Sequence, residues 1–179
     1  MPFSGPKKKV YTEDELYVYA VGALARRMRT VAELKRLLRQ KVESDTEFGQ
    51  TLVELIIRRL KDQGYLNDAK YAAAYSSFRR DNEKFGRMRV ITDLKAKGVH
   101  GDIIDKAVSG AFEEIDEEKQ ARAFLQRKRL NKPANERQAA RIFRQLLRAG
   151  FRSKTIFAIL KKWDVDEETL TALETETTE

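Results

Sequence analysis

Apolar residues recur along the chain in a pattern that appears three times. Leu34, Leu37 and Val42 are separated by three and then five positions. The same spacing returns in Ile91, Leu94, Val99 and in Phe143, Leu146, Phe151. The last two copies lie 52 positions apart without a gap. A period of this length predicts stacked helical repeats, which bury their apolar faces against one another and offer a long surface to a large partner.

Strand signals are poor throughout the sequence. It has no sustained alternation of apolar and polar residues and no Asn-Gly or Asp-Gly turn. The periodicity and the helix start and stop signals instead predict an all-α fold with nine helices. The expected helices cover residues 13–28, 31–42, 46–63, 68–82, 87–97, 102–114, 117–130, 136–149 and 153–163.

The expected helix starts carry capping residues. In a capping box, a short polar side chain accepts from an unpaired backbone N–H, and a Glu or Gln three residues later reciprocates. Four such pairs are Thr12–Glu15, Thr30–Glu33, Ser44–Glu47 and Asn135–Gln138. A cap of this kind contributes about 1 kcal/mol to helix stability, so it fixes where a helix begins.

Three glycines mark helix ends. Gly64, Gly98 and Gly150 follow segments rich in Lys or Arg, and each precedes an apolar residue. This order is typical of a left-handed glycine just past a helix, followed by a residue that packs back onto the helix. We therefore expect positive φ at all three glycines.

The nine helices group into three modules of three helices each. The expected modules cover 11–66, 67–115 and 116–164. A module of about 50 residues buries only a small core by itself. We therefore expect the three modules to pack against one another in an elongated, curved array. Residues 1–10 are expected to form a flexible basic arm, and 165–179 a disordered acidic tail.

The charge of the chain is unevenly distributed. The 179 residues carry a net charge of +8, but the last sixteen hold seven acids and no base. Residues 1–163 therefore carry +15, a charge that attracts polyanions. The acidic end is either a solvated tail or a segment that folds back and competes with nucleic acid. No apolar stretch approaches the ~18 residues of a membrane span, so we expect a cytoplasmic protein.

The sequence offers little that could carry catalysis. It lacks cysteine, and its single histidine, His100, lies in a turn where a surface or capping role is expected. The nine glycines form neither a dinucleotide fingerprint nor a P-loop. Acidic clusters lack the spacing of metal ligands. We expect no enzyme activity, no catalytic residue, no cofactor and no metal site.

Basic residues are the stronger signal. On the helix expected over 136–149, arginines form a stripe roughly 60° wide, opposite the apolar side. Some basic residues could merely complement the dipoles of helix ends. Their recurrence at matching places nevertheless favours one functional surface. The candidate contacts to nucleic acid or a large partner are Arg79, Arg80, Arg87, Arg89, Arg137, Arg141, Arg144 and Arg148.

Exposed aromatic side chains could act as base-stacking platforms. Most aromatic residues here recur at positions equivalent to apolar anchors, as Phe78 does with Leu130 in the 52-residue register. We therefore expect Tyr65, Tyr71 and Phe78 to pack in the core.

The middle of the chain resembles a known family. It reads Gly64-Tyr65-Leu66-Asn67-Asp68, then Tyr71-Ala72, and continues through Phe85-Gly86 to Lys97-Gly98-Val99. This order strongly resembles the RecX family of bacterial recombination regulators, over about residues 12–163. The outer modules agree with it chiefly in hydrophobic pattern. The motif positions taken to be structural are Gly64, Tyr65, Leu66, Asp68, Tyr71, Gly86, Leu94 and Gly98.

The resemblance implies a monomeric, non-enzymatic modulator of the RecA recombinase. Family members bind the groove of the RecA filament on single-stranded DNA and limit filament extension, ATP hydrolysis and strand exchange. They also bind single- and double-stranded DNA weakly and without sequence preference. No membrane partner is expected. Two alternatives remain open: a protein that binds duplex DNA directly, and a helical scaffold independent of RecA. Tight, sequence-selective duplex binding would favour the first alternative.

Overall fold

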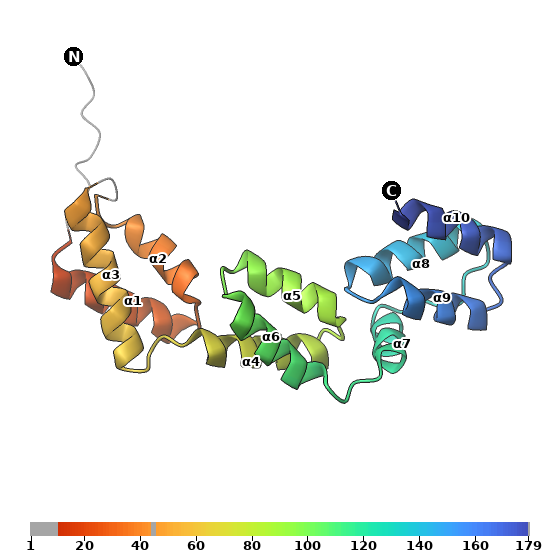
Figure 1. The fold of residues 1–179 in the computed structure, drawn as a ribbon, viewed down its shortest axis with the longest axis horizontal. Coiled ribbons are helices and arrows are strands. Elements are labelled where there is room, and N and C mark those ends of the chain that lie inside the picture. Colours follow the sequence, from red (N-terminus) through yellow and green to blue (C-terminus); the bar gives the residue numbers. More distant parts are fainter. Residues whose placement is uncertain (1–10, 44–45, 179) are drawn as a thin grey trace, which may run out of the picture. The chain divides into compact units, whose positions relative to one another are not determined.

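A computed structural model describes residues 11–43 and 46–178, and every regular element in those ranges is an α-helix (Figure 1). The all-α prediction is confirmed. The helices are α1 (Glu13–Arg26), α2 (Val31–Arg39), α3 (Glu47–Asp62), α4 (Asp68–Asp81), α5 (Arg87–Ala96), α6 (Gly101–Phe112), α7 (Glu117–Arg127), α8 (Glu136–Arg148), α9 (Ser153–Lys162) and α10 (Glu167–Thr178). The nine expected helices all form, and α10 is additional. The predicted arm over 1–10 lies outside the described residues.

The chain forms two compact units. The first comprises the residues up to Ala72 together with Lys95–Ile103, and the second comprises Ala73–Leu94 together with the residues from Ile104 on. Helices α4, α5 and α6 thus contribute residues to both units. The three module boundaries and the curved shape of the array stay predictions.

The first unit is built on the packing of α1, α2 and α3 against one another. Its core contains Leu16, Leu34, Leu38, Ile56 and Leu60, all fully buried. Burying a leucine or isoleucine side chain contributes about 1.5–3 kcal/mol, so these residues dominate the stability of the unit. Val42 is buried as its place in the repeat predicts, whereas Leu37 is only partly buried.

The second unit has its main core among α7, α8, α9 and α10. Phe143, Leu146 and Phe151, the third copy of the apolar pattern, are all buried there. Aromatic rings reinforce this core, since the ring centroid of Phe124 lies 5.9 Å from that of Phe151 in an edge-to-face arrangement.

The stop signals are confirmed at all three glycines, with φ of +76° at Gly64, +74° at Gly98 and +90° at Gly150. After α8, the N–H of Gly150 donates to the carbonyl of Leu147 at 3.0 Å, and Phe151 packs into the core. The expectation for Tyr65 is wrong, because its side chain is 60% exposed. Leu66, one residue later, is buried in its place.

The start signals are confirmed at two of the four sites in full. Thr12 and Thr30 each form a complete capping box. At Asn135 the side chain accepts from the backbone of Gln138, but the Gln138 side chain accepts from Ala134 instead. The box predicted at Ser44–Glu47 depends on Ser44, which lies outside the described residues. In the described part, Thr46 caps α3, because its hydroxyl accepts from the N–H of Gly49.

In the first unit, the start of α2 meets the end of α5. The Thr30 hydroxyl, fully buried, donates to the carbonyl of Lys97 at 2.7 Å. The Asp68 carboxylate accepts from the N–H of Val31 at 2.8 Å, so a residue of α4 bonds to the first residue of α2. A Cβ at Gly98 would lie only 2.4 Å from the Cβ of Ala32, so this approach requires a glycine.

Glu33 strengthens this junction through an ion pair with Lys97 at 3.2 Å. Burial raises the pKa of Glu33, but the backbone hydrogen bond at Thr30 and the charge of Lys97 lower it by more. The pKa therefore lies below its usual value. The carboxylate is therefore charged at neutral pH. The stability it contributes is lost only as the pH falls through that lowered pKa.

In the second unit, the start of α5 meets the end of α8 in the same way. The N–H of Gly86 donates to the carbonyl of Ala149 at 2.8 Å, and that of Met88 donates to Gly150 at 3.2 Å. A Cβ at Gly150 would lie 2.2 Å from the backbone nitrogen of Arg89. Gly98 and Gly150 occupy equivalent positions in the 52-residue register, so each ends a helix and admits the start of another.

The prediction of a disordered tail is wrong for the described part of 165–179. Residues Glu167–Thr178 form α10, which packs against α8. Leu170 and Leu173 are buried in the same core cluster as Phe143. The acidic composition concealed these two apolar residues, which lie three positions apart and fall on one side of a helix.

Replacing Gly150 by alanine is expected to destabilise the protein by about 3 kcal/mol, which for a chain of this size lowers the melting temperature by roughly 6–12 °C. The new Cβ would occupy a left-handed conformation and overlap the start of α5. Thermal melting followed by circular dichroism measures the change. Gly110→Ala is the control: Gly110 lies inside α6 with open space around its Cβ position, so alanine should stabilise there. Equal melting temperatures for the two variants would contradict this account.

Replacing Thr30 by alanine is expected to cost about 2–3 kcal/mol, because it removes a cap and leaves the partly buried carbonyl of Lys97 without its donor. Thr12→Ala is a matched control, since Thr12 forms the same capping box at an exposed site. That variant should lose only about 1 kcal/mol. Urea denaturation of both variants measures the difference, and an equal loss would mean that the Thr30–Lys97 contact adds nothing.

Candidate functional site

Helix α8 presents the clearest basic surface. Its buried side carries Ala139, Ile142, Phe143 and Leu146. The opposite side carries four exposed arginines: Arg137, Arg141, Arg144 and Arg148. We call these four the α8 arginine face. The division expected from the sequence is therefore present in the structure.

Helix α8 holds these arginines on a rigid support. The Asn135 side chain caps its first turn, and the glycine turn at Gly150 closes its last. Arg137 and Arg141 form no ion pair with another described residue, so their guanidinium groups are available to an external anion. Arg148 donates from Nε to the carbonyl of Arg144 at 3.2 Å, which orients it along the helix.

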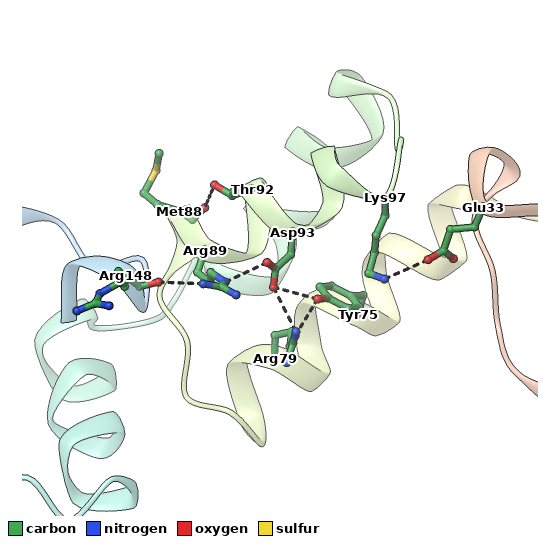
Figure 2. Close-up of polar contacts among 9 residues, drawn as sticks. All are labelled: Glu33, Tyr75, Arg79, Met88, Arg89, Thr92, Asp93, Lys97 and Arg148. Carbon is green, nitrogen blue, oxygen red and sulfur yellow. Dashed lines mark hydrogen bonds and ion pairs between the residues drawn. The ribbon is translucent and has the colours of Figure 1, made fainter. Parts of the chain in front are cut away.

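Arg79 and Arg89 are brought together by one carboxylate, that of Asp93 on α5 (Figure 2). Arg89 donates to Asp93 Oδ1 at 3.0 Å, and Arg79 donates to Oδ2 at 3.3 Å. The Tyr75 hydroxyl also donates to Oδ2, at 3.0 Å, and accepts from Arg79 at 2.8 Å. Two of the eight candidate arginines thus share this one acid.

The environment of this cluster keeps Arg79 charged. Burial lowers the pKa of Arg79, but the hydrogen bond with Tyr75 and the charge of Asp93 raise it above its usual value. Burial also raises the pKa of the Tyr75 hydroxyl, so that group stays neutral at physiological pH. The guanidinium of Arg79 lies about equally far from the ring centroids of Tyr75 and Phe85, at 5.0 and 5.1 Å. Arg79 is therefore chiefly a structural residue.

Arg89 links this cluster to the α8 arginine face. Its guanidinium donates to the carbonyl of Arg148 at 3.4 Å (Figure 2), while 43% of its side chain remains exposed. The contact follows from the junction between α5 and α8 at Gly86 and Gly150. The sequence suggested that Arg89 and the α8 arginines would share a surface, and the structure places Arg89 at the end of α8.

The other two candidates face α6. Arg80 forms a bidentate ion pair with Asp81, at 2.7 and 2.8 Å, and also donates to the carbonyl of Ala111. Arg87 donates to the hydroxyl of Ser109 at 3.1 Å. Because hydrogen bonds within the protein already hold both guanidinium groups, they are weaker candidates for an external partner than the α8 arginine face. That any of the eight arginines contacts DNA stays a prediction.

Several of the motif residues are buried or bond to another helix, while the structural role of the whole motif stays a prediction. Gly86 is buried at the junction of α5 and α8, and Tyr71 and Leu94 are buried. Asn67 caps α4 through the N–H of Lys70, whereas Asp68 reaches across to α2.

The sequence did not point to Asp93, the residue that forms ion pairs with both Arg79 and Arg89. The only available signal was its position four residues after Arg89, a spacing that places the two side chains together on a helix. Core packing was also the wrong expectation for Phe78, whose side chain is 54% exposed.

Other chemistry finds little support in the described residues. The His100 side chain is exposed, and its Nδ1 lies 3.6 Å from the carboxylate of Asp102, which is also exposed. Over residues 11–43 and 46–178, no group of three or more His, Asp or Glu side chains is arranged to hold a metal ion. Within the same ranges, no helix is long and apolar enough to cross a membrane.

Comparison with known structures supports the fold. The crystal structure of RecX from Lactobacillus salivarius superposes with a TM-score of 0.61 at 23% identity, covering 85% of this chain and 96% of that one. A second crystal structure, of a regulatory protein RecX, gives a TM-score of 0.58, also at 23% identity, over 84% of this chain and 73% of that one.

Sequence comparison supports the family. A profile described as the second three-helix domain of RecX matches residues 67–108. The regulatory protein RecX of Trichlorobacter lovleyi is 32% identical over 152 residues, which cover 83% of this chain and 96% of that protein. The RecX protein of Deinococcus radiodurans is 32% identical over 88% of this chain and 72% of its own length. The counterpart in Myxococcus xanthus is 31% identical over 88% of this chain and 89% of its length. On the sequence, the fold and these relatives together, the chain belongs to the RecX family.

Proposed function

We propose that this protein modulates the RecA recombinase, mainly as an inhibitor. It would bind in the groove of the RecA–DNA filament and limit filament extension, ATP hydrolysis and strand exchange. Membership of the RecX family supports the regulatory role, because the relatives compared are named regulatory proteins. In this proposal the protein is a cytoplasmic monomer without catalytic activity or cofactor, and its partners are the RecA filament and DNA.

The observation that carries the proposal within the molecule is the α8 arginine face. Four guanidinium groups on one rigid helix suit a partner with closely spaced phosphates, as the DNA backbone in a filament has. Arginine is suited to this role because its planar fork bonds phosphate oxygens in pairs. Arg89, at the end of α8, would extend the same contact. Arg79, Arg80 and Arg87 support the fold of this surface and contribute to its positive field.

The test is the DNA-dependent ATPase activity of the cognate RecA in the presence of this protein. The wild-type protein should inhibit hydrolysis at stoichiometric ratios. Arg137→Glu together with Arg141→Glu should require roughly tenfold more protein for the same inhibition, because two phosphate contacts become repulsive. Both side chains are exposed, so the fold should be retained, and circular dichroism checks it.

The matched control is Arg58→Glu with Lys70→Glu, which changes the net charge equally at two exposed residues of α3 and α4. This variant should inhibit nearly as well as wild type. If the control loses as much as the α8 variant, total charge rather than the α8 arginine face governs inhibition. If wild-type protein leaves ATP hydrolysis unchanged, the proposed function is wrong.

Direct binding to DNA without RecA is the second candidate, since Arg137 and Arg141 lack an acidic partner among the described residues. A salt titration with single-stranded and random duplex DNA separates the two. Weak binding that falls steeply with salt fits an auxiliary contact within the filament. Tight binding to one duplex sequence, with no effect on RecA, would favour a DNA-binding protein.

A further inference from the structure

Helix α10 brings a concentrated negative charge next to the most basic part of the chain. Residues 116–163 contain fourteen basic and four acidic residues, whereas residues 164–179 contain seven acids and no base. Five of these acids have described side chains in or just before α10, which packs on α8, the helix that carries the arginine face (Figure 1); they are Asp164, Asp166, Glu167, Glu168 and Glu174. An acidic element placed there reduces the positive potential that a phosphate backbone would meet.

Apolar contacts hold α10 in this position. Leu170 and Leu173 are buried in the core cluster that contains Phe143 and Leu146 of α8. Asp166 caps the helix by accepting from the N–H of Thr169 at 2.8 Å and from its hydroxyl at 2.9 Å. The backbone and hydroxyl hydrogen bonds at Thr169 lower the pKa of Asp166, so this cap is charged at neutral pH.

The acids of this segment already pair with cations of the basic region. Asp164 accepts from the ammonium group of Lys132 at 2.7 Å, and Glu167 lies 3.6 Å from that of Lys161. The hydrogen bond from Lys132 and its charge lower the pKa of Asp164. Carboxylates here thus occupy positions from which they compete with phosphate groups for lysine side chains.

The attachment leaves the acids themselves in solvent. Glu167, Glu168 and Glu174 are exposed, while the leucines between them are buried. The two functions of the helix are therefore carried by different residues: the leucines dock it, and the glutamates supply charge. The charge can be removed by substitution without disturbing the packing.

We propose that α10 is an autoinhibitory acidic helix, which lowers the affinity of the α8 arginine face for nucleic acid by acting as an internal polyanion. This inference rests on the proposed function, because it requires the α8 arginine face to bind the DNA backbone. Its consequence is that the protein binds nucleic acid weakly by itself. A filament, which presents many phosphates together, competes better with the acidic helix than an isolated strand does.

The test replaces Glu167, Glu168 and Glu174 by glutamine in the full chain and measures binding to fluorescein-labelled oligo(dT) by anisotropy at low salt. Affinity should rise by about three- to tenfold, and the gain should shrink as salt screens the charges. Trp163, the only tryptophan, lies partly buried against the core cluster that holds α10. An unchanged Trp163 emission maximum shows that the helix remains docked.

The matched control replaces Glu13, Glu47 and Glu54 by glutamine. Like the α10 set, it comprises two acids in a first helical turn and one inside a helix, all exposed, but on α1 and α3. The affinity of this control variant for oligo(dT) should change less than twofold, since these acids do not belong to the helix that packs against α8. An equal gain in both triple variants would show that net charge alone is responsible and would overturn the proposal.

The remaining outcomes separate this inference from the proposed function. If the α10 variant binds as wild type does while Arg137→Glu with Arg141→Glu loses affinity, the arginine face binds DNA and the acidic helix does not inhibit it. If the arginine variant binds oligo(dT) as tightly as wild type, the α8 site fails instead. A gain in the α10 variant alone, with a loss in the arginine variant, supports both.

Discussion

Helix ends carry backbone N–H and C=O groups that have no partner within their own helix, and much of this structure depends on how two pairs of ends satisfy one another. The first residues of α2 meet the last carbonyls of α5, and the start of α5 meets the end of α8. Each contact is short because a glycine ends the receiving helix. Gly98 and Gly150 turn the chain away with positive φ, and the missing Cβ leaves room for the incoming helix.

The same junctions place the charged groups. Arg89 lies next to the carbonyl of Arg148 because α5 begins where α8 ends, and Lys97 reaches Glu33 because α2 begins where α5 ends. Asp93 forms an ion pair with both Arg79 and Arg89. The basic residues that were candidates for external contacts therefore divide into two groups. Those near the junction are held by acids and carbonyls, whereas those along the exposed side of α8 remain open to solvent. The proposed function needs both groups, since a rigid support would make the exposed arginines effective.

The acidic helix completes this arrangement of charge. A chain so basic would bind nucleic acid of any kind, which would compete with recognition of a particular filament. Docking an acidic helix on α8 lowers that general attraction while leaving the arginines in place. Affinity for DNA and selectivity for a partner can then be set by different residues of the same unit: the arginines of α8 and the glutamates of α10.

The sequence by itself determined the local structure. Apolar spacing, threonine caps and glycines after basic segments located nine helices, because these signals act between residues that are close along the chain. It also identified the exposed arginines of α8, since the two sides of one helix follow from its period. Tyr65 and Phe78 show where such reasoning ends. Tyr65 follows a glycine that ends a helix, and Phe78 matches an apolar residue in the 52-residue register, yet both are exposed, because burial depends on what lies opposite.

Only the tertiary structure decided which residues meet across the chain. Nothing in the sequence indicates that Thr30 bonds to Lys97, that Asp68 accepts from the N–H of Val31, or that Asp93 joins two arginines, because such contacts depend on how helices are placed in space. The acidic segment after Trp163 is the clearest case. Its composition predicted disorder, but two leucines three residues apart are enough to dock a helix where a neighbouring core offers an apolar surface. Local patterns determine where helices begin and end along the chain. Which helices pack together is determined by the free energy of burial, to which distant segments contribute jointly.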